Sequence, residues 1–369
     1  SFLTHKVDGI KHKYEHPAKN HEEAIRFVLK RLLNKEYGVI KSINELTGVG
    51  HRVVHGGEKF SDSVLITNEV IEEIEKCEDL APLHNPAAVT GIKACQKIMP
   101  DIPMIAVFDT AFHQTLPKEH YLYPIPYEYY EKYGVRKYGF HGTSHKYVAH
   151  RIAELMGTPI EKLKIINCHL GQGASVCAIK NGHSVETSMG LTPLGGIPMG
   201  TRSGDLDPSV VTYLMKRDNL SPDEIENILN RASGAYGISQ ISIDFRDIEA
   251  EAAANNPYAI LALAHYNYAV ACYIAKCAVA MNGVDVITFT AGVGEKGPES
   301  REAICSHLGF LGVTLDLEKN NVKGEEREIS TPDSKVKVYI IPTNEELMIA
   351  RETLNLIKRK EENNENFSN

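Results

Sequence analysis

Short, uninterrupted apolar runs alternate with amphipathic stretches along most of the chain, and this pattern predicts a mixed α/β fold. Residues 21–35 space their apolar side chains as on one side of a helix, which predicts an amphipathic helix. The apolar run at 104–108 predicts a buried strand that ends at Asp109. Because ligands of open α/β sheets gather at the carboxyl ends of strands, Asp109 is a candidate functional residue.

Other strands are predicted where apolar runs meet turn or cap signals. They lie at 49–57, 162–170, 284–292 and 336–342. Asn181-Gly182 separates two β-rich runs and predicts a tight hairpin. Asn85 as a cap, with Pro86 at the first helical position, predicts a helix start, and Thr343 is expected to cap the last helix. Hairpins are therefore inserted among the strands and helices.

Length and composition are those of a globular protein. The chain has 369 residues, 43% of them hydrophobic and 24% charged, which suits about two domains and excludes disordered, collagenous and coiled-coil chains. The formal net charge of -8 argues against a nucleic-acid binder. If this acidic protein handles anions, it must gather its cations locally.

The cysteines and the apolar stretches indicate a cytoplasmic protein with no membrane segment. The seven cysteines are scattered without a CxxC motif, which favours a reduced chain. The N-terminal SFLTHKVDGI lacks the pattern of a secretory signal. Residues 252–275 carry no formal charge and are long enough to cross a bilayer, but they are rich in Ala and contain Asn, His and Tyr. We interpret 257–282 as a buried helix that suits a subunit interface.

Three glycine-rich turns follow predicted strands, at 169–175, 193–205 and 291–297. Glycine lets a backbone approach phosphate closely and direct N–H groups at it. None of the turns is a Walker A motif, and the last alone fits equally well an ordinary loop before a helix that begins at Pro298. Three such turns in one chain favour nucleotide binding.

Arginine and acidic residues near these turns fit phosphate chemistry. Arg52 and Arg202 lie beside small or turn residues, where Arg suits bidentate binding of carboxylate or phosphate, although either could be an ordinary surface residue. Asp109 is either a cap or a metal ligand. Glu345 and Glu346 either complement a helix dipole or supply a Mg²⁺ contact.

His141 and His145 are four residues apart in FHGTSH and could face one zinc ion on a helix. No glutamate follows the first histidine as in HExxH, and GxSxG is missing, which argues against a zinc site and against a hydrolase. A histidine that donates to a transferring charged group fits better. His84 and His169 suit structural and functional roles equally.

Taken together, nine segments resemble the acetate kinase (acetokinase) family and appear in the order of that family. They are HRVVHGGE (51–58), APLHNPA (81–87), FDTAFH (108–113), YGFHGTSH (138–145), NCHLGQGAS (167–175), SMGLTPLGGIPMGTRSGDLDP (188–208), DFR (244–246), AGVGE (291–295) and TNEE (343–346).

The resemblance implies two RNase H-like α/β domains of the actin-like ATPase superfamily with an active-site cleft between them. One domain would comprise 1–112 plus 346–369, and the other 113–345 with the nucleotide site and the dimer interface. It further implies a homodimer that converts ATP and acetate to ADP and acetyl phosphate with Mg²⁺, or Mn²⁺.

The resemblance also assigns roles to residues. Arg52 corresponds to the residue that binds the acetate carboxylate, and Arg202 and His141 correspond to those that hold the phosphoryl group. Asp109 corresponds to the catalytic acidic residue, Glu345 corresponds to the magnesium-linked glutamate, and both are expected to bind Mg²⁺. The acyl pocket corresponds to Val54, Leu83, Phe140 and Pro193. The phosphate loop corresponds to His169, Leu170, Gly171, Gln172 and Gly173. The adenosine pocket corresponds to Asp244, Phe245, Arg246, Gly292, Val293, Gly294 and Lys296.

The chain departs from the family pattern in three places. The family's opening strand and Asn-x-Gly-Ser-Ser-Ser loop would precede Ser1, so the first strands of the N-terminal domain are expected to be absent from this chain. Gln172 and Lys296 stand where the family usually has Asn. A propionate or butyrate kinase, a pyrophosphate-dependent relative and a non-catalytic nucleotide-binding fragment therefore remain alternatives.

Overall fold

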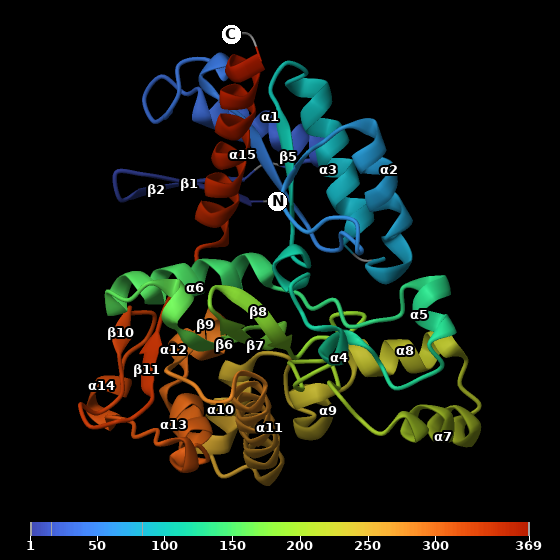
Figure 1. The fold of residues 1–369 in the computed structure, drawn as a ribbon, viewed down its shortest axis with the longest axis vertical. Coiled ribbons are helices and arrows are strands. Elements are labelled where there is room, and N and C mark those ends of the chain that lie inside the picture. Colours follow the sequence, from blue (N-terminus) through green and yellow to red (C-terminus); the bar gives the residue numbers. More distant parts are fainter. Residues whose placement is uncertain (1, 16, 83, 368–369) are drawn as a thin grey trace. The chain divides into compact units, whose positions relative to one another are not determined.

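The computed structural model describes residues 2–15, 17–82 and 84–367, and the chain forms two compact units (Figure 1). The first unit comprises Ser1–Ala111 together with Glu346–Asn369, and the second comprises Phe112–Glu345. Each unit has its own sheet, helices and buried core. The mixed α/β prediction is confirmed.

The first unit is built on a three-stranded sheet in the order β3-β5-β4. Its elements are β3 (Val49–Val53), β4 (Val64–Leu65), β5 (Met104–Phe108), α1 (His21–Leu32), α2 (Asn68–Lys76), α3 (Asn85–Ile98) and, from Glu346, α15 (Glu345–Phe367). Strands β3 and β5 are parallel, and β4 is antiparallel to β5. Helix α15 packs closely on β3, because a Cβ added to Gly50 would lie 2.5 Å from Ile349 Cγ2. The predicted helix over 21–35 and the strand over 104–108 are confirmed.

A hairpin of β1 (Phe2–Val7) and β2 (Ile10–Glu15) also belongs to this unit. Its turn is Asp8-Gly9, with φ of 48° and 82°. The sequence interpretation missed this hairpin, although Asp-Gly is a strong hairpin signal.

Two predicted caps are wrong by one position. Asn85 is the first residue of α3, and its buried side chain instead accepts from the His55 N–H (3.1 Å) and donates to the carbonyls of His55 (3.0 Å) and Ile74 (3.1 Å). Thr343 precedes α15 by two residues, and its hydroxyl contacts that of Ser144 at 2.8 Å. Longer-range hydrogen bonds use both side chains, so neither serves as a helix cap.

The second unit contains a six-stranded sheet in the order β10-β11-β9-β6-β7-β8. The strands are β6 (Lys164–Leu170), β7 (Ala174–Lys180), β8 (His183–Thr187), β9 (Val286–Thr290), β10 (Arg327–Glu328) and β11 (Lys337–Ile340). β6, β9 and β11 run parallel, whereas β7 is antiparallel to both of its neighbours. Leaving out the short β10, the strands lie across the sheet in the chain order third, second, first, fourth, fifth, which is the RNase H-like arrangement. The Asn181-Gly182 hairpin between β7 and β8 is confirmed, with φ of 54° and 81°.

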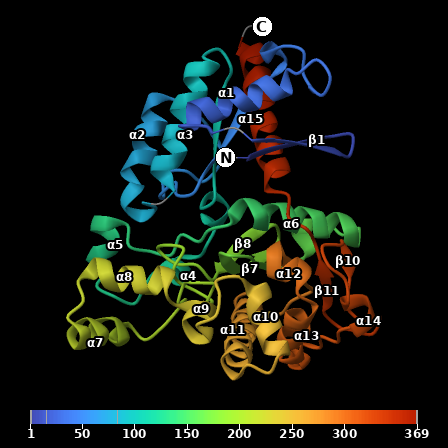
Figure 2. The same ribbon diagram turned by 180° about the vertical axis from the view of Figure 1, so that it is seen from behind.

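Helices cover both faces of this sheet (Figures 1 and 2). Helix α6 (Gly142–Met156) lies on one face and α11 (Pro257–Met281) on the other. The side of α11 that faces the sheet is buried, including Tyr266 and Val270, whereas Leu261 on another side is 57% exposed. By length and composition alone, α11 is the one helix within 2–15, 17–82 and 84–367 that could span a membrane.

The remaining helices of the second unit are shorter. They are α4 (Lys118–Tyr121), α5 (Glu128–Tyr133), α7 (Pro208–Asp218), α8 (Pro222–Arg231), α9 (Gly234–Ser239), α10 (Phe245–Ala253), α12 (Ala291–Lys296), α13 (Pro298–Ser306) and α14 (Leu317–Asn320). The segment predicted as a loop before Pro298 forms α12, so that prediction is wrong. Ala291 opens this helix with φ of 65°.

Candidate active site

The strand register of the first unit brings Arg52 and Asp109 together. Parallel pairing places Val53 opposite Phe108, so Arg52 on β3 lies beside Asp109, which directly follows β5. The Arg52 guanidinium donates from Nε to Asp109 Oδ1 (3.1 Å) and from Nη2 to Oδ2 (2.6 Å). The Asp109 side chain is 1% exposed, whereas that of Arg52 is 43% exposed. The ion pair is therefore buried on the side of Asp109 and partly exposed to solvent on the side of Arg52.

Two residues of the predicted acyl pocket also fall in this unit. Val54 is buried at the end of β3. Leu83 lies outside the described residues.

In the second unit, His141, Gly173 and Arg202 converge. His141 is the residue before α6 and has φ of 58°, which is unusual for a residue with a side chain. A Cβ added to Gly173 would lie 3.3 Å from His141 Nε2 and 3.5 Å from Arg202 Nη1. Arg202 Nη1 also donates to the Pro193 carbonyl at 3.3 Å. Glycine at 173 therefore leaves room in front of an imidazole and a guanidinium.

Burial and stacking define the surroundings of these groups. Burial lowers the pKa of the Arg202 guanidinium from its ordinary value, although an arginine stays charged at neutral pH. The ring of His169 stacks on that of His141, with centroids 4.1 Å apart. Phe140 is buried, and its carbonyl accepts from His113 Nε2 at 2.9 Å. Of the predicted residues, His141, Arg202, Pro193 and the phosphate loop are thus close together.

The predicted metal ligands are divided between the two units. Asp109 belongs to the first unit, and Glu345, half-buried at the start of α15, belongs to the second. No group of three or more His, Cys, Asp or Glu among the described residues could hold a metal ion. Any bound Mg²⁺ would therefore need oxygen ligands from a substrate as well as from protein carboxylates.

A cavity of about 440 Å³ in the second unit collects most of the predicted adenosine residues. Its predicted lining residues are Gly171, Gln172, Asp244, Phe245, Arg246, Gly292, Val293 and Lys296. Leu170 is buried instead, and the Gly294 carbonyl accepts from the buried Arg301 at 2.9 Å. His169 and Gly173 do not line the cavity.

The sequence interpretation missed two lining residues, Glu249 and Lys323, whereas the third, Gly297, lies in the predicted glycine-rich turn 291–297. Glu249 follows Phe245 by four residues on α10, so helical spacing could have indicated it. Burial raises the pKa of the Glu249 carboxyl, and the nearby Glu299 charge adds to this effect. The Arg246 guanidinium holds the pKa of Asp244 at about 2.

Comparison with known proteins decides the family. The model of the acetokinase family matches residues 1–351. The chain belongs to the acetokinase family. An acetate kinase of Caldanaerobacter subterraneus subsp. tengcongensis is 62% identical over 361 residues, which are 97% of this chain and 90% of that relative. The family prediction made from the nine segments is confirmed.

Solved structures of related kinases match the same extent of the chain. Porphyromonas gingivalis acetate kinase is 47% identical with a TM-score of 0.91, covering 96% of this chain and 90% of that one. A propionate kinase from Francisella tularensis is 41% identical with a TM-score of 0.88, covering 96% and 89%. Acetate kinases of this family are phosphotransferases, so the enzyme prediction is confirmed.

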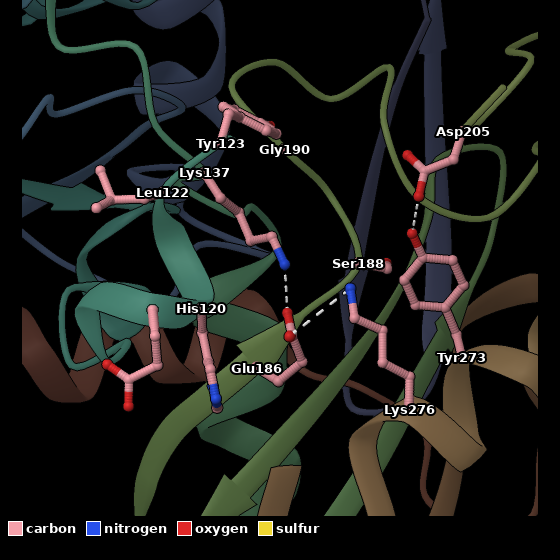
Figure 3. Close-up of a pocket in the computed structure, with 11 residues that line it drawn as sticks. His120, Leu122, Tyr123, Lys137, Glu186, Ser188, Gly190, Asp205, Tyr273 and Lys276 are labelled. Carbon is pink, nitrogen blue, oxygen red and sulfur yellow. Dashed lines mark hydrogen bonds and ion pairs between the residues drawn. The ribbon is translucent and has the colours of Figure 1, made fainter. Parts of the chain in front are cut away.

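A second cavity, of about 300 Å³, is lined by residues that include Lys137, Glu186, Asp205 and Tyr273 (Figure 3). Lys137 forms a buried ion pair with Glu186 in it. Asp205 accepts from the Gly196 N–H at 2.7 Å and from the Tyr273 hydroxyl, so it ties the turn at 193–205 to α11. The sequence interpretation missed this cavity because its residues come from distant segments.

Proposed function

We propose that this acetokinase-family chain transfers a phosphoryl group reversibly between ATP and acetate, giving ADP and acetyl phosphate. The observation that carries the proposal is the position of the loop 171–173. Gly171 and Gln172 line the 440 Å³ cavity, and the next residue, Gly173, faces His141 and Arg202. A nucleotide seated in the cavity would direct its phosphates along this loop towards a cation and an imidazole.

The chemistry needs positioning more than proton transfer. A carboxylate such as acetate is already ionised at neutral pH, so the nucleophile requires no general base. Phosphoryl transfer passes through a loose transition state whose charge spreads over the equatorial oxygens. Arg202 and His141 would hold those oxygens, and Arg52 would hold the acetate carboxylate. These local cations would act within a chain of net charge -8.

Asp109 and Glu345 are the carboxylates that we assign to magnesium, and their oxygen ligands suit this ion. Both oxygens of Asp109 accept from Arg52, but each keeps a second lone pair, and carboxylate oxygens are the ligands that Mg²⁺ prefers. When bound, Mg²⁺ would neutralise charge on the ATP phosphates. Asp109 would in addition orient the guanidinium of Arg52 through two hydrogen bonds.

The decisive test is Arg202→Ala in a hydroxamate assay for acetyl phosphate. Because the lost contact acts mainly in the transition state, kcat should fall by about 10³-fold while the circular dichroism spectrum is unchanged. Arg217→Ala, on the exposed surface of α7, is the matched control and should keep normal turnover. Near-normal kcat in Arg202→Ala would refute the proposed role.

Propionate is the second candidate acceptor, because a solved propionate kinase is 41% identical to this chain. The same assay with acetate, propionate and butyrate separates the two assignments. We expect the highest kcat/KM with acetate, and a maximum at propionate would reassign the substrate.

We further propose that the enzyme is a cytoplasmic homodimer. All seven cysteines are free, which fits a reducing compartment. The side of α11 that faces away from the sheet exposes apolar side chains, with Tyr258 62%, Leu261 57% and Tyr268 57% exposed. A second copy would cover them. Leu261→Asp should halve the mass measured by sedimentation, and an unchanged dimer would contradict this interface.

A further inference from the structure

A chain of buried polar side chains leads away from His141 into the second unit. Ser175 Oγ lies 2.9 Å from His141 Nδ1 and 2.8 Å from His145 Nε2. Asn167 Nδ2 lies 2.8 Å from His145 Nδ1, and the Thr288 hydroxyl lies 2.7 Å from Asn167 Oδ1. The side chains behind His141 have no solvent-accessible surface. Buried polar groups at this spacing form a hydrogen-bonded network.

The fold places these groups on one face of the sheet. Thr288 on β9 is directly opposite Asn167 on β6, and Ser175 on β7 is opposite His169, which shares the face of Asn167. Helix α6 covers this face and brings His145 there, one turn after His141. The network therefore depends on strand register and on the packing of one helix.

The contact between Thr288 and Asn167, at the end of the network furthest from His141, determines which atoms donate hydrogen bonds and which accept them. The Thr288 hydroxyl has its close acceptor at Asn167 Oδ1, because its other neighbour, the Ile166 carbonyl, is 3.5 Å away. With Oδ1 turned to Thr288, the amide N–H of Asn167 must donate to Nδ1 of His145. His145 therefore accepts a hydrogen bond at Nδ1.

The hydrogen bond at Nδ1 of His145 determines which groups donate further along the network. Burial lowers the pKa of His145 well below its ordinary value, so the ring is neutral and carries one proton. Since Nδ1 accepts, the proton is on Nε2 and is donated to Ser175 Oγ. The hydroxyl of Ser175 accepts this hydrogen bond and donates its own proton in a hydrogen bond to Nδ1 of His141. The same logic leaves the proton of a neutral His141 on Nε2, the atom beside Gly173.

We propose that Asn167, His145 and Ser175 are positioning residues whose directional hydrogen bonds hold His141 as the Nε2–H tautomer. The role of this tautomer rests on the proposed function: the Nε2–H donor then faces the transferring phosphoryl group. The αL backbone of His141 and its stacking on His169 fix where the ring lies, and the chain of hydrogen bonds fixes which nitrogen donates.

Nitrogen NMR tests this assignment directly. The full chain is labelled with [¹⁵N]histidine, and His141 is assigned by loss of its signals in His141→Asn. Long-range ¹H–¹⁵N correlation should show the His141 proton on Nε2 at neutral pH without any substrate. In Ser175→Ala, which interrupts the chain of hydrogen bonds, His141 should populate both tautomers. We expect kcat to fall by about 10–100-fold, by analogy with the loss of hydrogen-bond partners of metal-binding histidines.

Two further variants keep the test decisive. Thr288→Val removes the donor at the far end in a similar shape, so it should also mix the His141 tautomers, even if Ser175→Ala fails to fold. Ser144→Ala is the matched control, because it removes the 2.8 Å contact to His169 Nδ1 and should leave the His141 tautomer unchanged.

The outcomes separate this proposal from the proposed function. A wild-type His141 protonated on Nδ1, or an unchanged tautomer in both chain variants, overturns the directional chain. Absence of acetyl phosphate formation by the wild-type protein together with the expected NMR shifts would refute the kinase assignment but leave the chain of hydrogen bonds intact.

Discussion

The two units fix their candidate active-site groups by opposite means. In the first unit, Arg52 and Asp109 form a bidentate ion pair that is open to solvent on the arginine side. In the second, His141 is reached through buried neutral groups, Ser175 and His145 among them. A charge can be held where water still reaches one partner, whereas a fully buried site favours neutral groups and directional hydrogen bonds. The difference therefore follows from the depth of each site.

We expect the largest effect from substitutions that break the ion pair between Arg52 and Asp109 in the first unit. Arg52→Ala leaves the buried Asp109 carboxylate without a cation, and we expect the free energy of unfolding to fall by about 3 kcal/mol, at the low end for a buried pair because Arg52 is partly exposed. Asp109→Asn keeps an acceptor for Arg52 and should cost about 1 kcal/mol. Urea unfolding followed by hydrogen exchange on peptides of the first unit measures both. Equal losses would show that depth of burial does not control the pair.

The next largest expected effect is the pH dependence of stability that arises from buried, neutral histidines of the second unit. Burial lowers the pKa of His113 to about 4, with Lys137 adding to the shift and Glu186 opposing it. The unfolded chain therefore binds more protons below pH 6.5, and stability is lost as the pH falls from 6.5 towards 4. His113 alone should contribute a loss of about 2 kcal/mol between pH 6.5 and 5.

His113→Gln should make this pH dependence less steep, whatever its effect on absolute stability. The exposed His183→Gln in the same unit is the matched control and should keep the wild-type slope. Urea unfolding at pH 6.5 and 5, followed by hydrogen exchange on peptides of the second unit, gives the change in the free energy of unfolding with pH for each protein. Identical slopes in wild type and His113→Gln would contradict a neutral, buried His113.

Residues at strand ends were predictable because their signal is local. Asp109 follows an apolar run directly, and Asn181-Gly182 marks its own hairpin, so sequence alone placed both. The family motifs also indicated His141 and Arg202. The wrong caps at Asn85 and Thr343 share a cause: each side chain serves a distant partner that local spacing does not reveal.

The hydrogen-bond chain behind His141 could not be predicted for the same reason. His145 stood out only as a possible zinc ligand four residues from His141, and Ser175 and Asn167 only as parts of a motif. Their partnership depends on the register of three strands and on the helix that covers them. Such contacts join residues as many as 121 positions apart, as between Asn167 and Thr288.

The smallest expected effect extends the comparison of the two units to apolar residues that we propose for the acyl pocket. Val54 of the first unit and Phe140 of the second are both buried, but the Phe140 carbonyl also accepts from His113, so Val54 offers the cleaner substitution. Val54→Ala should favour propionate over acetate by about 1 kcal/mol, or roughly fivefold in the ratio of kcat/KM values, since one methylene is worth little more in an apolar pocket. Val64→Ala, on β4 of the same unit, controls for a general loss of packing and should keep the acetate preference. If both variants retain the wild-type ratio, Val54 does not line the acyl pocket, and the specificity of the site must come from other residues.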